Sequence, residues 1–498
     1  MSAQTRRVSQ RILTALLAAS IGIAPALPAQ TNLPDLGDPA QAFMSTVQER
    51  KVGEAAMREV RSSGVWLNDP EVNGYLNELG NRLVTAIPGA GFDFEFFAMN
   101  DATINAFALP GGFVGVNTGL ILLAQTESEL ASVLAHEISH VTQHHMARQL
   151  AGQQQALLTS LGALAVAILA ARSAGSSSGQ ATQAAVAGAQ GLAIQTQLNF
   201  TREYEQEADR IGFQRLDAAG FDDRAMATFM EKLQRSTRFA EGTTPAPSYL
   251  RTHPVTYERI AEAEARADRK PFRQVKDSID FHLVRALIRS YQGTPREAVA
   301  FFDDALAQKR YTSEIAVRYG LVASLLRAQN FQRALPELAT LEKTAPQHPM
   351  IEAMAGQVLT QSGQVRQAIA RYEAALQRYP AKMQLVYDYP EALLLDKQAA
   401  KAASFLEVQL QRYPADGLLH QVAAKAYAAL GKQLLQHQHQ GEFYAWQGNL
   451  QAAVSQFELA VKAKDGDFYQ LSVAESRLKA VRDELAEQKK SGGGSRPG

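Results

Sequence analysis

Apolar residues recur at helical spacing through most of this 498-residue chain, and one short region departs from that spacing. From about residue 40 to 86 the spacing predicts helices, one of which is expected to begin at Asp69 and Pro70, a favoured N-cap followed by a favoured first position. Over 92–96 phenylalanine alternates with acidic residues, and over 111–117 another apolar run follows a Gly-rich turn. These two runs predict strands of a small sheet.

A further helix is expected to begin at Thr126. Thr126 and Glu129 have the spacing of a capping box, and apolar residues then form one helical stripe as far as Val141. Glu137 falls on the side of this helix that should face the interior. A carboxylate in that position needs a partner or a bound cation, because burying an unpaired charge is costly.

From about residue 278 onward the chain has a helical repeat. Pro346, Pro380 and Pro414 lie 34 residues apart, which is the period of the tetratricopeptide helix pair. We expect about four to five repeats over 278–488, stacked into a solenoid, followed by a disordered tail at 489–498. A solenoid of this kind binds other chains and has no chemistry of its own.

Two features of the later repeats are less regular. Gly448 follows the turn residue Gly431 after only 17 residues, which predicts that half a repeat breaks the register and that the last helices form an irregular cap. His437 and His439 stand in a Gln-His-Gln-His-Gln tract. We expect them on a solvated face, with a second metal site as the alternative.

Composition narrows the classes of function. Fifty Lys and Arg balance fifty Asp and Glu, so the chain has no basic surface excess of the kind that nucleic-acid binding requires. The absence of cysteine excludes disulfides, thiol catalysis and cysteine ligation of a metal. Histidine and carboxylate side chains are therefore the remaining candidates for zinc donors.

The N-terminus has the features of an export signal. Three arginines precede the apolar run 12–24, and small residues follow it, so residues 1–29 are expected to be a signal peptide cleaved near 26–29. An uncleaved anchor is the alternative. In both cases the working part of the protein lies outside the cytoplasm.

The strongest chemical signal is His136-Glu137-Ile138-Ser139-His140. Two histidines four residues apart on a helix lie on one face, about 6 Å from each other, where neutral imidazoles can hold one zinc ion. Glu137 beside them is then placed to act as a general base. This is the H-E-x-x-H pattern of zinc peptidases.

A second helical segment, 201–213, offers a third donor. Glu205 and Asp209 share a stripe with small and apolar residues, which suits a close approach to a cation. Glu205 is the expected third zinc ligand, and Asp209, one turn later, is expected to orient one of the histidines. Glu207 lies off this stripe and is expected to be solvated, although it remains the alternative ligand.

Together with the Thr-His-Pro tract at His253 and with Arg259, these residues make the chain resemble the M48 family of zinc metalloproteases over roughly 40–270. The resemblance implies a zincin-like metalloprotease domain at 30–272 with a small sheet, followed by the tetratricopeptide-repeat domain at 278–488. The expected fold class is α+β, mainly helical.

The resemblance also implies roles for particular residues. It favours Glu205 over Glu207 as ligand of the single zinc ion, and it brings His253 and Arg259 to the active site as catalytic residues. The implied substrate-binding element is an edge strand made of Gly111, Gly112, Phe113, Val114, Gly115, Val116 and Asn117. His253 is expected either to donate a hydrogen bond during the reaction or to fill the open metal position in a resting enzyme.

With an export signal and repeats, the resemblance implies a periplasmic zinc endopeptidase that degrades misfolded or stalled outer-membrane proteins and assists their assembly. The repeats would recruit substrate or the β-barrel assembly machinery. One alternative is a periplasmic chaperone or scaffold whose peptidase is latent. Another is a membrane-embedded M48 protease.

The segment 149–201 separates the two expected metal-binding helices. It contains one charged residue, Arg172, in an Ala-, Gly-, Gln- and Ser-rich context. We expect a lid over the cleft that contacts a membrane surface, while a membrane span and a buried helical hairpin remain alternatives. The apolar part, 156–171, is short for a span.

Overall fold

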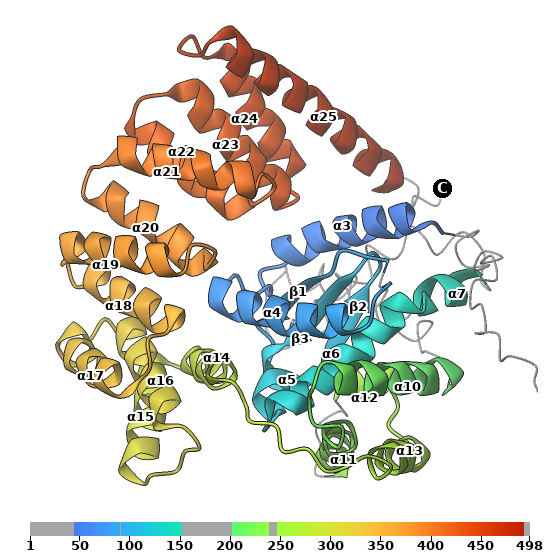
Figure 1. Ribbon diagram of the computed structural model, residues 1–498. Coiled ribbons are helices and arrows are strands. Elements are labelled where there is room, and N and C mark those ends of the chain that lie inside the picture. The colour runs from blue at the N-terminus through green and yellow to red at the C-terminus, as the bar shows by residue number, and fades with distance from the viewer. Residues whose placement is uncertain (1–43, 90, 152–201, 239–246, 493–498) are drawn as a thin grey trace, which may run out of the picture.

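The computed structural model describes residues 44–89, 91–151, 202–238 and 247–492. The expected signal peptide and residues 152–201 of the expected lid lie outside these described residues. Figure 1 shows an N-terminal domain built around a three-stranded sheet and an arc of helices that follows it. This described part has the mainly helical α+β architecture that the sequence predicts.

The sheet has the strand order β1-β3-β2. β1 (Glu95–Met99) pairs in parallel with β3 (Phe113–Asn117), and β2 (Ala106–Leu109) pairs antiparallel with β3. The expectation that the third strand lies at an edge is therefore wrong, because it is inserted between the two earlier strands. Gly111 and Gly112 are turn residues with φ of 77° and 94°, a conformation that favours glycine.

The two faces of the sheet are covered by different helices. α4 (Pro70–Ala86) and α6 (Glu127–Thr142) cover one face, and α3 (Thr46–Ser62) covers the other. The strand residues toward α4 and α6 are Phe96, Ala98, Val114 and Val116. Those toward α3 are Phe97, Met99 and Phe113. Neighbouring strand residues thus point to opposite faces, as the pleat requires.

The helices α3 and α4 account for the helical pattern predicted before the sheet. α4 begins where the sequence predicts: the Asp69 side chain accepts hydrogen bonds from the backbone of Glu71 and Val72 at 2.9 and 3.0 Å. β1 begins later than the alternation predicts, with Phe92 and Phe94 before it. Because β1 is buried on both faces of the sheet, its sequence is a continuous apolar run after Glu95.

The remaining helices of the N-terminal domain are α5 (Thr118–Leu123), α7 (His145–Ala151), α10 (Arg202–Ala218), α11 (Ala225–Arg238), α12 (Ser248–Thr252) and α13 (Tyr257–Ala267). Residues 271–278 have no regular structure and connect this domain to the repeats.

The repeat domain consists of helices that pack against their neighbours in sequence. They are α14 (Ile279–Ser290), α15 (Pro295–Ala307), α16 (Glu314–Arg327), α17 (Phe331–Thr344), α18 (Pro349–Gln361), α19 (Val365–Arg378), α20 (Met383–Leu395), α21 (Ala399–Arg412), α22 (Gly417–Ala429), α23 (Gln433–Trp446), α24 (Leu450–Lys462) and α25 (Phe468–Gly492).

The repeat register continues to the end of the solenoid. α18, α20 and α22 begin 34 residues apart, and α24 begins 33 residues after α22. The predicted break is wrong because Gly448 is a turn between repeats, whereas Gly431 is a turn inside one. The last helix also extends to Gly492, so 489–492 of the predicted tail is helical.

The solenoid bends back onto the N-terminal domain (Figure 1). α14 packs against α4 and α5 at one end of the arc. At the other end Arg58 of α3 pairs with Glu484 of α25 at 3.1 Å, and the rings of Trp66 and Trp446 lie 5.3 Å apart. The two domains enclose a cavity of about 880 Å³ between these contacts.

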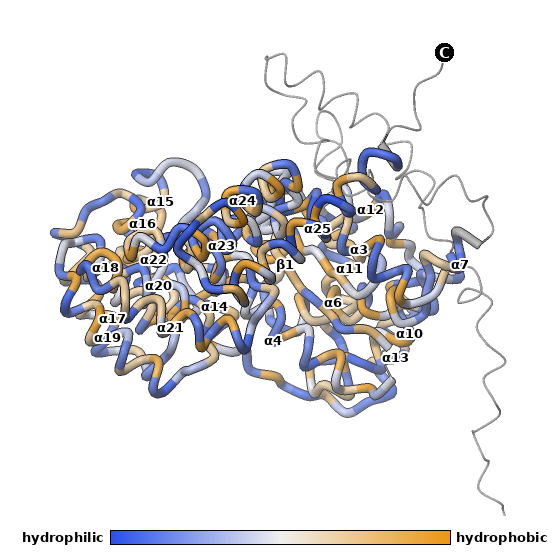
Figure 2. The backbone as a smooth tube through the Cα atoms, turned by 90° about the horizontal axis from the view of Figure 1, so that it is seen from above, coloured by the Kyte–Doolittle hydropathy of each residue, from blue (hydrophilic) through white to orange (hydrophobic). Residues whose placement is uncertain are grey.

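Hydrophobic and hydrophilic residues are mixed along the helices of both domains (Figure 2). Within the described ranges, no helix has both the length and the apolar content needed to cross a bilayer.

Candidate metal centre and active site

Helix α6 carries three residues of the site. The helix begins at the predicted N-cap, where the Thr126 side chain accepts from the Glu129 backbone at 3.2 Å. The side chains of His136, Glu137 and His140 are buried, with relative exposures of 3%, 1% and 3%. The structure therefore places Glu137 in the interior, as the helical pattern predicts.

Helix α10 brings Glu205 to the two histidines. It lies very close to α6 because Gly212 has no side chain: a Cβ there would lie 3.2 Å from backbone atoms of Ala135 and His136. Ala208, on the same stripe, is fully buried. The small residues of α10 thus allow a carboxylate to reach a helix that bears two imidazoles.

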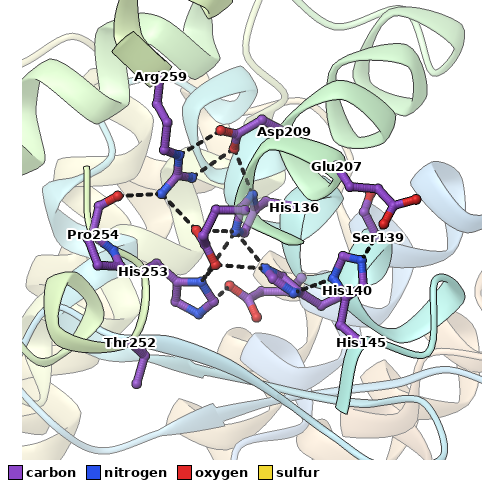
Figure 3. A network of polar contacts seen from close by, with 12 residues as sticks. His136, Ser139, His140, His145, Glu207, Asp209, Thr252, His253, Pro254 and Arg259 are labelled. Carbon is purple, nitrogen blue, oxygen red and sulfur yellow. Dashed lines mark hydrogen bonds and ion pairs between the residues drawn. The ribbon is translucent and has the colours of Figure 1, made fainter. Parts of the chain in front are cut away.

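Four side chains converge on one point: His136, His140, Glu205 and His253. Figure 3 shows the three histidines of this group turned toward one another. The Nε2 atoms of His136 and His140 are 2.9 Å apart. The two Glu205 oxygens lie 3.5 Å from His136 Nε2 and 3.3 Å from His140 Nε2. His253 Nδ1 lies 2.9 Å from Glu205 Oε1 and 3.4 Å from His136 Nε2.

These separations fit a four-coordinate metal ion. Donors about 2.0–2.1 Å from a tetrahedral ion lie about 3.3 Å from one another. Five distances between donor atoms of different side chains run from 2.9 to 3.5 Å, and the four side chains each offer a donor atom within 4.8 Å of the others. A set of imidazole nitrogens and one carboxylate, fully buried, is typical of zinc sites.

Asp209 and Arg259 lie behind the donors. Asp209 Oδ1 is 2.9 Å from His136 Nδ1, which leaves Nε2 directed at the other donors. Arg259 donates to both Asp209 oxygens at 2.7 and 2.8 Å, and its Nη1 lies 2.7 Å from Glu205 Oε2. Arg259, expected to be catalytic, therefore contacts the carboxylates that hold the site together.

Burial and charge have opposite effects on these groups. Burial raises the pKa of Asp209, but the Arg259 guanidinium outweighs it and holds that pKa below its ordinary value. The pKa of Glu205 is held well below its ordinary value, because His253 and His136 outweigh burial. Burial lowers the pKa of His136, yet the two carboxylates raise it to about 10. The field between these carboxylates therefore favours a cation.

Glu137 has a free oxygen that faces the cluster. Among the described residues, its Oε1 is buried and has no hydrogen-bond partner, and His253 Nε2 lies 3.6 Å from it. Leaving a buried acceptor unsatisfied is costly, so such atoms in native proteins usually have a functional reason. A base that accepts a proton from a bound water supplies one.

The position of His253 is fixed from behind. The residue follows α12, and its ring stacks on Tyr249 with the centroids 4.7 Å apart. The Tyr249 backbone in turn donates to the Ile104 carbonyl at 3.2 Å. Because Ile104 precedes β2, this contact links the histidine to the start of that strand.

The sequence patterns did not single out His145. Its Nδ1 lies 2.9 Å from His140 Nδ1, and its Nε2 lies 3.0 Å from Glu207 Oε2. Arg148 also contacts Glu207, at 2.9 Å. Glu207 is thus not one of the metal donors: its side chain is 27% exposed, and it lies at the far end of a chain of contacts that holds His140. The only signal was a second His pair directly after the motif, and the turn at His144, with φ of 51°, brings it back.

The histidines of the repeats form no comparable centre. His439 is not on a solvated face, because it stacks on Tyr427 and its Nδ1 lies 2.8 Å from that of His420. Burial lowers the pKa of His439 to about 3. In the described part of the chain, the group at His136 is the one cluster of three or more potential metal donors.

Comparison with known proteins agrees with this geometry. The chain matches the Peptidase family M48 over residues 70–267. It is 34% identical over 457 residues, 90% of this chain and 92% of the relative, to the β-barrel assembly-enhancing protease of Escherichia coli K12. It is also 34% identical over 473 residues, 94% of this chain and 96% of the relative, to the putative β-barrel assembly-enhancing protease of Vibrio cholerae. The chain belongs to the M48 family of metallopeptidases.

A mitochondrial relative matches a shorter stretch. The mitochondrial metalloendopeptidase OMA1 of Schizosaccharomyces pombe is 30% identical over 191 residues, 38% of this chain and 51% of that protein. The two bacterial matches, in contrast, are long enough to extend into the repeats. The protein is therefore a metallopeptidase whose helical repeats also have counterparts in its bacterial relatives.

Proposed function

We propose that the protein is a periplasmic zinc endopeptidase that degrades misfolded or stalled outer-membrane proteins and assists their assembly. The observation that carries the proposal is the convergence of His136, His140 and Glu205 next to the unpaired oxygen of Glu137. The bacterial relatives are named β-barrel assembly-enhancing proteases, which supports the substrate class. The export signal expected at the N-terminus supports the location.

In this proposal His136, His140 and Glu205 hold one zinc ion. When bound, zinc polarises the scissile carbonyl and lowers the pKa of a water molecule. Glu137 accepts the proton of that water at its free Oε1 and then returns it to the leaving amine. Its burial prepares it for this exchange, because solvent does not compete for the same oxygen.

Asp209 and Arg259 act as positioning residues. Asp209 selects the ring orientation of His136, and Arg259 holds both Asp209 and Glu205 through three contacts of 2.7 to 2.8 Å. Outer partners of this kind orient metal ligands and tune their basicity. Arg259 faces carboxylates and not the side where a peptide would enter, so we assign it no direct contact with substrate.

His253 is a latch in this proposal. Its Nδ1 lies among the metal donors and its Nε2 lies close to Glu137, so it occupies the space that a peptide carbonyl needs. Withdrawal of His253 would open the site without moving the helices that carry the other donors. The variant His253→Ala should therefore raise peptidase activity, and a loss of activity would instead support a direct role in the reaction.

The substrate-binding edge is β2 in this proposal. Asn117 donates to the Asn105 carbonyl at 2.9 Å, so alternate residues from Asn105 onward bond to β3. Ala106 and Ala108 then direct their backbone groups away from the sheet, and no described backbone group bonds to them. Ala106 is fully buried and Ala108 is partly exposed, so the accessible part of this edge is at Ala108. Ala108 also lines a small pocket together with His140, which places this edge beside the donors.

The opposite edge is closed. At β1, the side chains of Asn73 and Asn77 of α4 bond to the backbone. Their oxygens accept from the N–H groups of Ala98 and Phe96 at 2.8 and 3.0 Å. Their amide groups donate to the carbonyls of Leu67 and Phe96. The Ala98 carbonyl accepts from Leu67 at 2.9 Å. In the described part of the chain, an extended peptide can therefore join the sheet at β2 and not at β1, by β-augmentation. Extended binding selects unfolded chains over compact ones.

The repeats would recruit the substrate or the β-barrel assembly machinery. They close around the cavity of about 880 Å³ that both domains line, close to α3 and α4. Attachment of a partner there would raise the local concentration of substrate without adding catalytic groups.

The proposal is tested with the purified mature chain loaded with zinc. We expect cleavage of an outer-membrane β-barrel protein in its unfolded form and little cleavage of the same protein folded in detergent. His253→Ala should accelerate the first reaction. Equal cleavage of folded and unfolded barrels would contradict recognition by strand addition, and no cleavage of either by both enzymes would contradict the proposed function.

A further inference from the structure

A second cavity, of about 630 Å³, lies between the N-terminal domain and the first repeats. Ile104 and Leu122 contribute apolar wall on one side, and Phe301 and Phe302 of α15 contribute it on the other. Phe301 is exposed to 44% of its surface. The volume of this cavity falls in the range of pockets that bind small ligands, and such pockets often lie between two domains.

The polar groups of this cavity are cationic. Arg285, Arg289 and Arg310 line it, His282 is beside them, and the lining contains no Asp or Glu. Among the described residues, none of the three arginines forms an ion pair with a carboxylate. In the next helix Arg318 shows the usual arrangement in this solenoid, where a guanidinium meets nearby glutamates.

Two of the arginines, Arg285 and Arg289, are held in place by neutral groups, which leave their charge uncompensated; Arg289 donates from Nη1 to the Gln292 side-chain oxygen. Arg285 donates from Nη2 to the Leu122 carbonyl at 3.0 Å, while its Nε is buried and unpaired within the described structure. Arg289 lies over the Phe301 ring at 4.1 Å. A planar guanidinium with free donors matches a carboxylate, which it binds through two parallel hydrogen bonds.

The cavity adjoins the start of the proposed substrate edge. Ala102 and Ile104, which line it, precede β2, and β2 runs from there toward His140. A peptide paired antiparallel to β2, the more stable pairing, runs in the opposite direction. Its C-terminal end therefore leaves the edge at Ile104, next to the arginines.

We propose that this cavity binds the C-terminal carboxylate of a substrate polypeptide, with the last, apolar side chain between Phe301 and Leu122. The free guanidinium groups supply the recognition of the carboxylate, and the aromatic and aliphatic walls supply the preference for an apolar residue. The identity of the occupant as a substrate chain rests on the proposed peptidase function and on pairing at β2.

Binding of a short fluorescent peptide that ends in phenylalanine tests the proposal. The zinc-loaded full chain carrying Glu137→Gln, which keeps the peptide intact, is titrated by fluorescence anisotropy with the free acid and with the C-terminal amide. We expect the free acid to bind about tenfold more tightly, because the amide removes the negative charge that strengthens the hydrogen bonds from the guanidinium groups. The double variant Arg289→Gln, Arg310→Gln should remove this preference.

Arg296→Gln is the matched control, because Arg296 is exposed on α15 and does not line the cavity. It should keep the full preference for the free acid. Equal binding of acid and amide, or an equal loss in the control, would overturn the proposal. So would binding of vesicles containing phosphatidylglycerol through these arginines without binding of the peptide, which would make the cavity a lipid site.

The same variants separate this inference from the proposed function. The double variant with an intact Glu137 should still cleave an unfolded substrate whose C-terminus is amidated. If it does so and no preference for the free acid exists, the inference fails and the peptidase stands. If the wild-type chain cleaves nothing, the peptidase proposal fails, while the anisotropy titration still reports on the cavity.

Discussion

The two domains treat charged side chains in opposite ways. In the peptidase domain Glu137, Asp209 and Arg259 are at most 5% exposed and belong to one site, where Asp209 pairs with Arg259. In the solenoid a typical pair, Arg333 and Asp303, joins neighbouring helices with 45% and 40% of the side chains exposed. One domain collects its charges in a single interior cluster, and the other distributes them over a repeated surface.

This difference shows where chemistry and binding reside. Burying charges is costly and is tolerated when they are paired with one another or with a metal, so an interior cluster that includes an unpaired carboxylate oxygen indicates a reaction site. An exposed ion pair contributes about 0–1 kcal/mol and can be replaced without loss of the fold. The solenoid can therefore change its surface for new partners, while the peptidase site cannot change without losing its metal.

The largest effect is expected from loss of a metal ligand. His140→Ala should bind no zinc and should lower cleavage of an unfolded substrate by about 10⁴-fold or more, the scale seen when a catalytic group is removed. His437→Ala is the matched control, because His437 lies in the solenoid, where its Nδ1 is 2.8 Å from Gln456 Oε1. Metal analysis and cleavage of both variants check this prediction. Full activity in His140→Ala would contradict the assignment of the chemistry to the peptidase domain.

A smaller loss of zinc affinity is expected when Asp209, which contacts the ligand His136, is changed. Asp209→Asn should weaken zinc affinity by about 10- to 100-fold, because His136 loses the group that orients its ring. Asp217→Asn on the same helix is the control, since Asp217 pairs with Lys270 away from the site. Competition with a chelator measures both affinities. An unchanged affinity in Asp209→Asn would remove Asp209 from the positioning network.

The open edge of β2 can be tested with a proline. Ala108→Pro removes a backbone N–H that faces outward, so the fold should survive, as prolines are tolerated at sheet edges. The KM for an unfolded substrate should rise about tenfold, because one ladder hydrogen bond is lost and the ring obstructs the peptide. Circular dichroism confirms folding, and steady-state kinetics gives KM and kcat. An unchanged KM would move the substrate away from this edge.

The pH dependence of stability tests the cost of a buried charge outside the site, at Glu71 of α4. Burial and the neighbouring Asp69 raise the pKa of Glu71, in α4, to about 8. Between pH 4.5 and 8 the unfolded chain loses this proton while the folded chain keeps it, so the stability it contributes below pH 4.5 is lost as the pH rises through that window. Glu71→Gln should therefore gain stability over the wild type from pH 5 to 8. Urea unfolding at several pH values measures this gain, and a constant difference would contradict it.

The smallest effect is expected at the solenoid surface. Arg333→Gln breaks the exposed pair with Asp303 and should change the free energy of unfolding by less than about 1 kcal/mol, with zinc content and cleavage unchanged. Thermal unfolding and the cleavage assay check both statements. A large loss of activity would mean that the surface charges of the repeats are coupled to the site.

The sequence predicts what depends on local spacing. His136 and His140 fall on one face of a helix because they are four residues apart, and the cap at Asp69 depends on its immediate neighbours. The approach of Glu205 was also predictable, since the small residues around it can only serve close packing. The 34-residue step likewise predicted the solenoid.

The features that could not be predicted from the sequence depend on contacts between residues that are distant in the chain. Nothing local in Phe113–Asn117 tells that this strand lies between two others, because strand order is set by the whole sheet. His145 reaches His140 only after the chain turns at a residue with positive φ. Arg259 of α13 contacts Glu205 and Asp209 of α10. The family motif predicts that Arg259 lies near the active site, but it does not predict which residues Arg259 contacts.

The most direct test of the central claim pairs zinc content with cleavage in the variant Glu137→Gln. Glu137 lies beside the donors without being one of them, so the variant should keep about one zinc ion per chain and the wild-type fold. Its cleavage of an unfolded β-barrel protein should fall below detection, because the glutamine amide cannot accept the proton that the Glu137 carboxylate accepts. Full zinc content with undiminished cleavage would contradict the account.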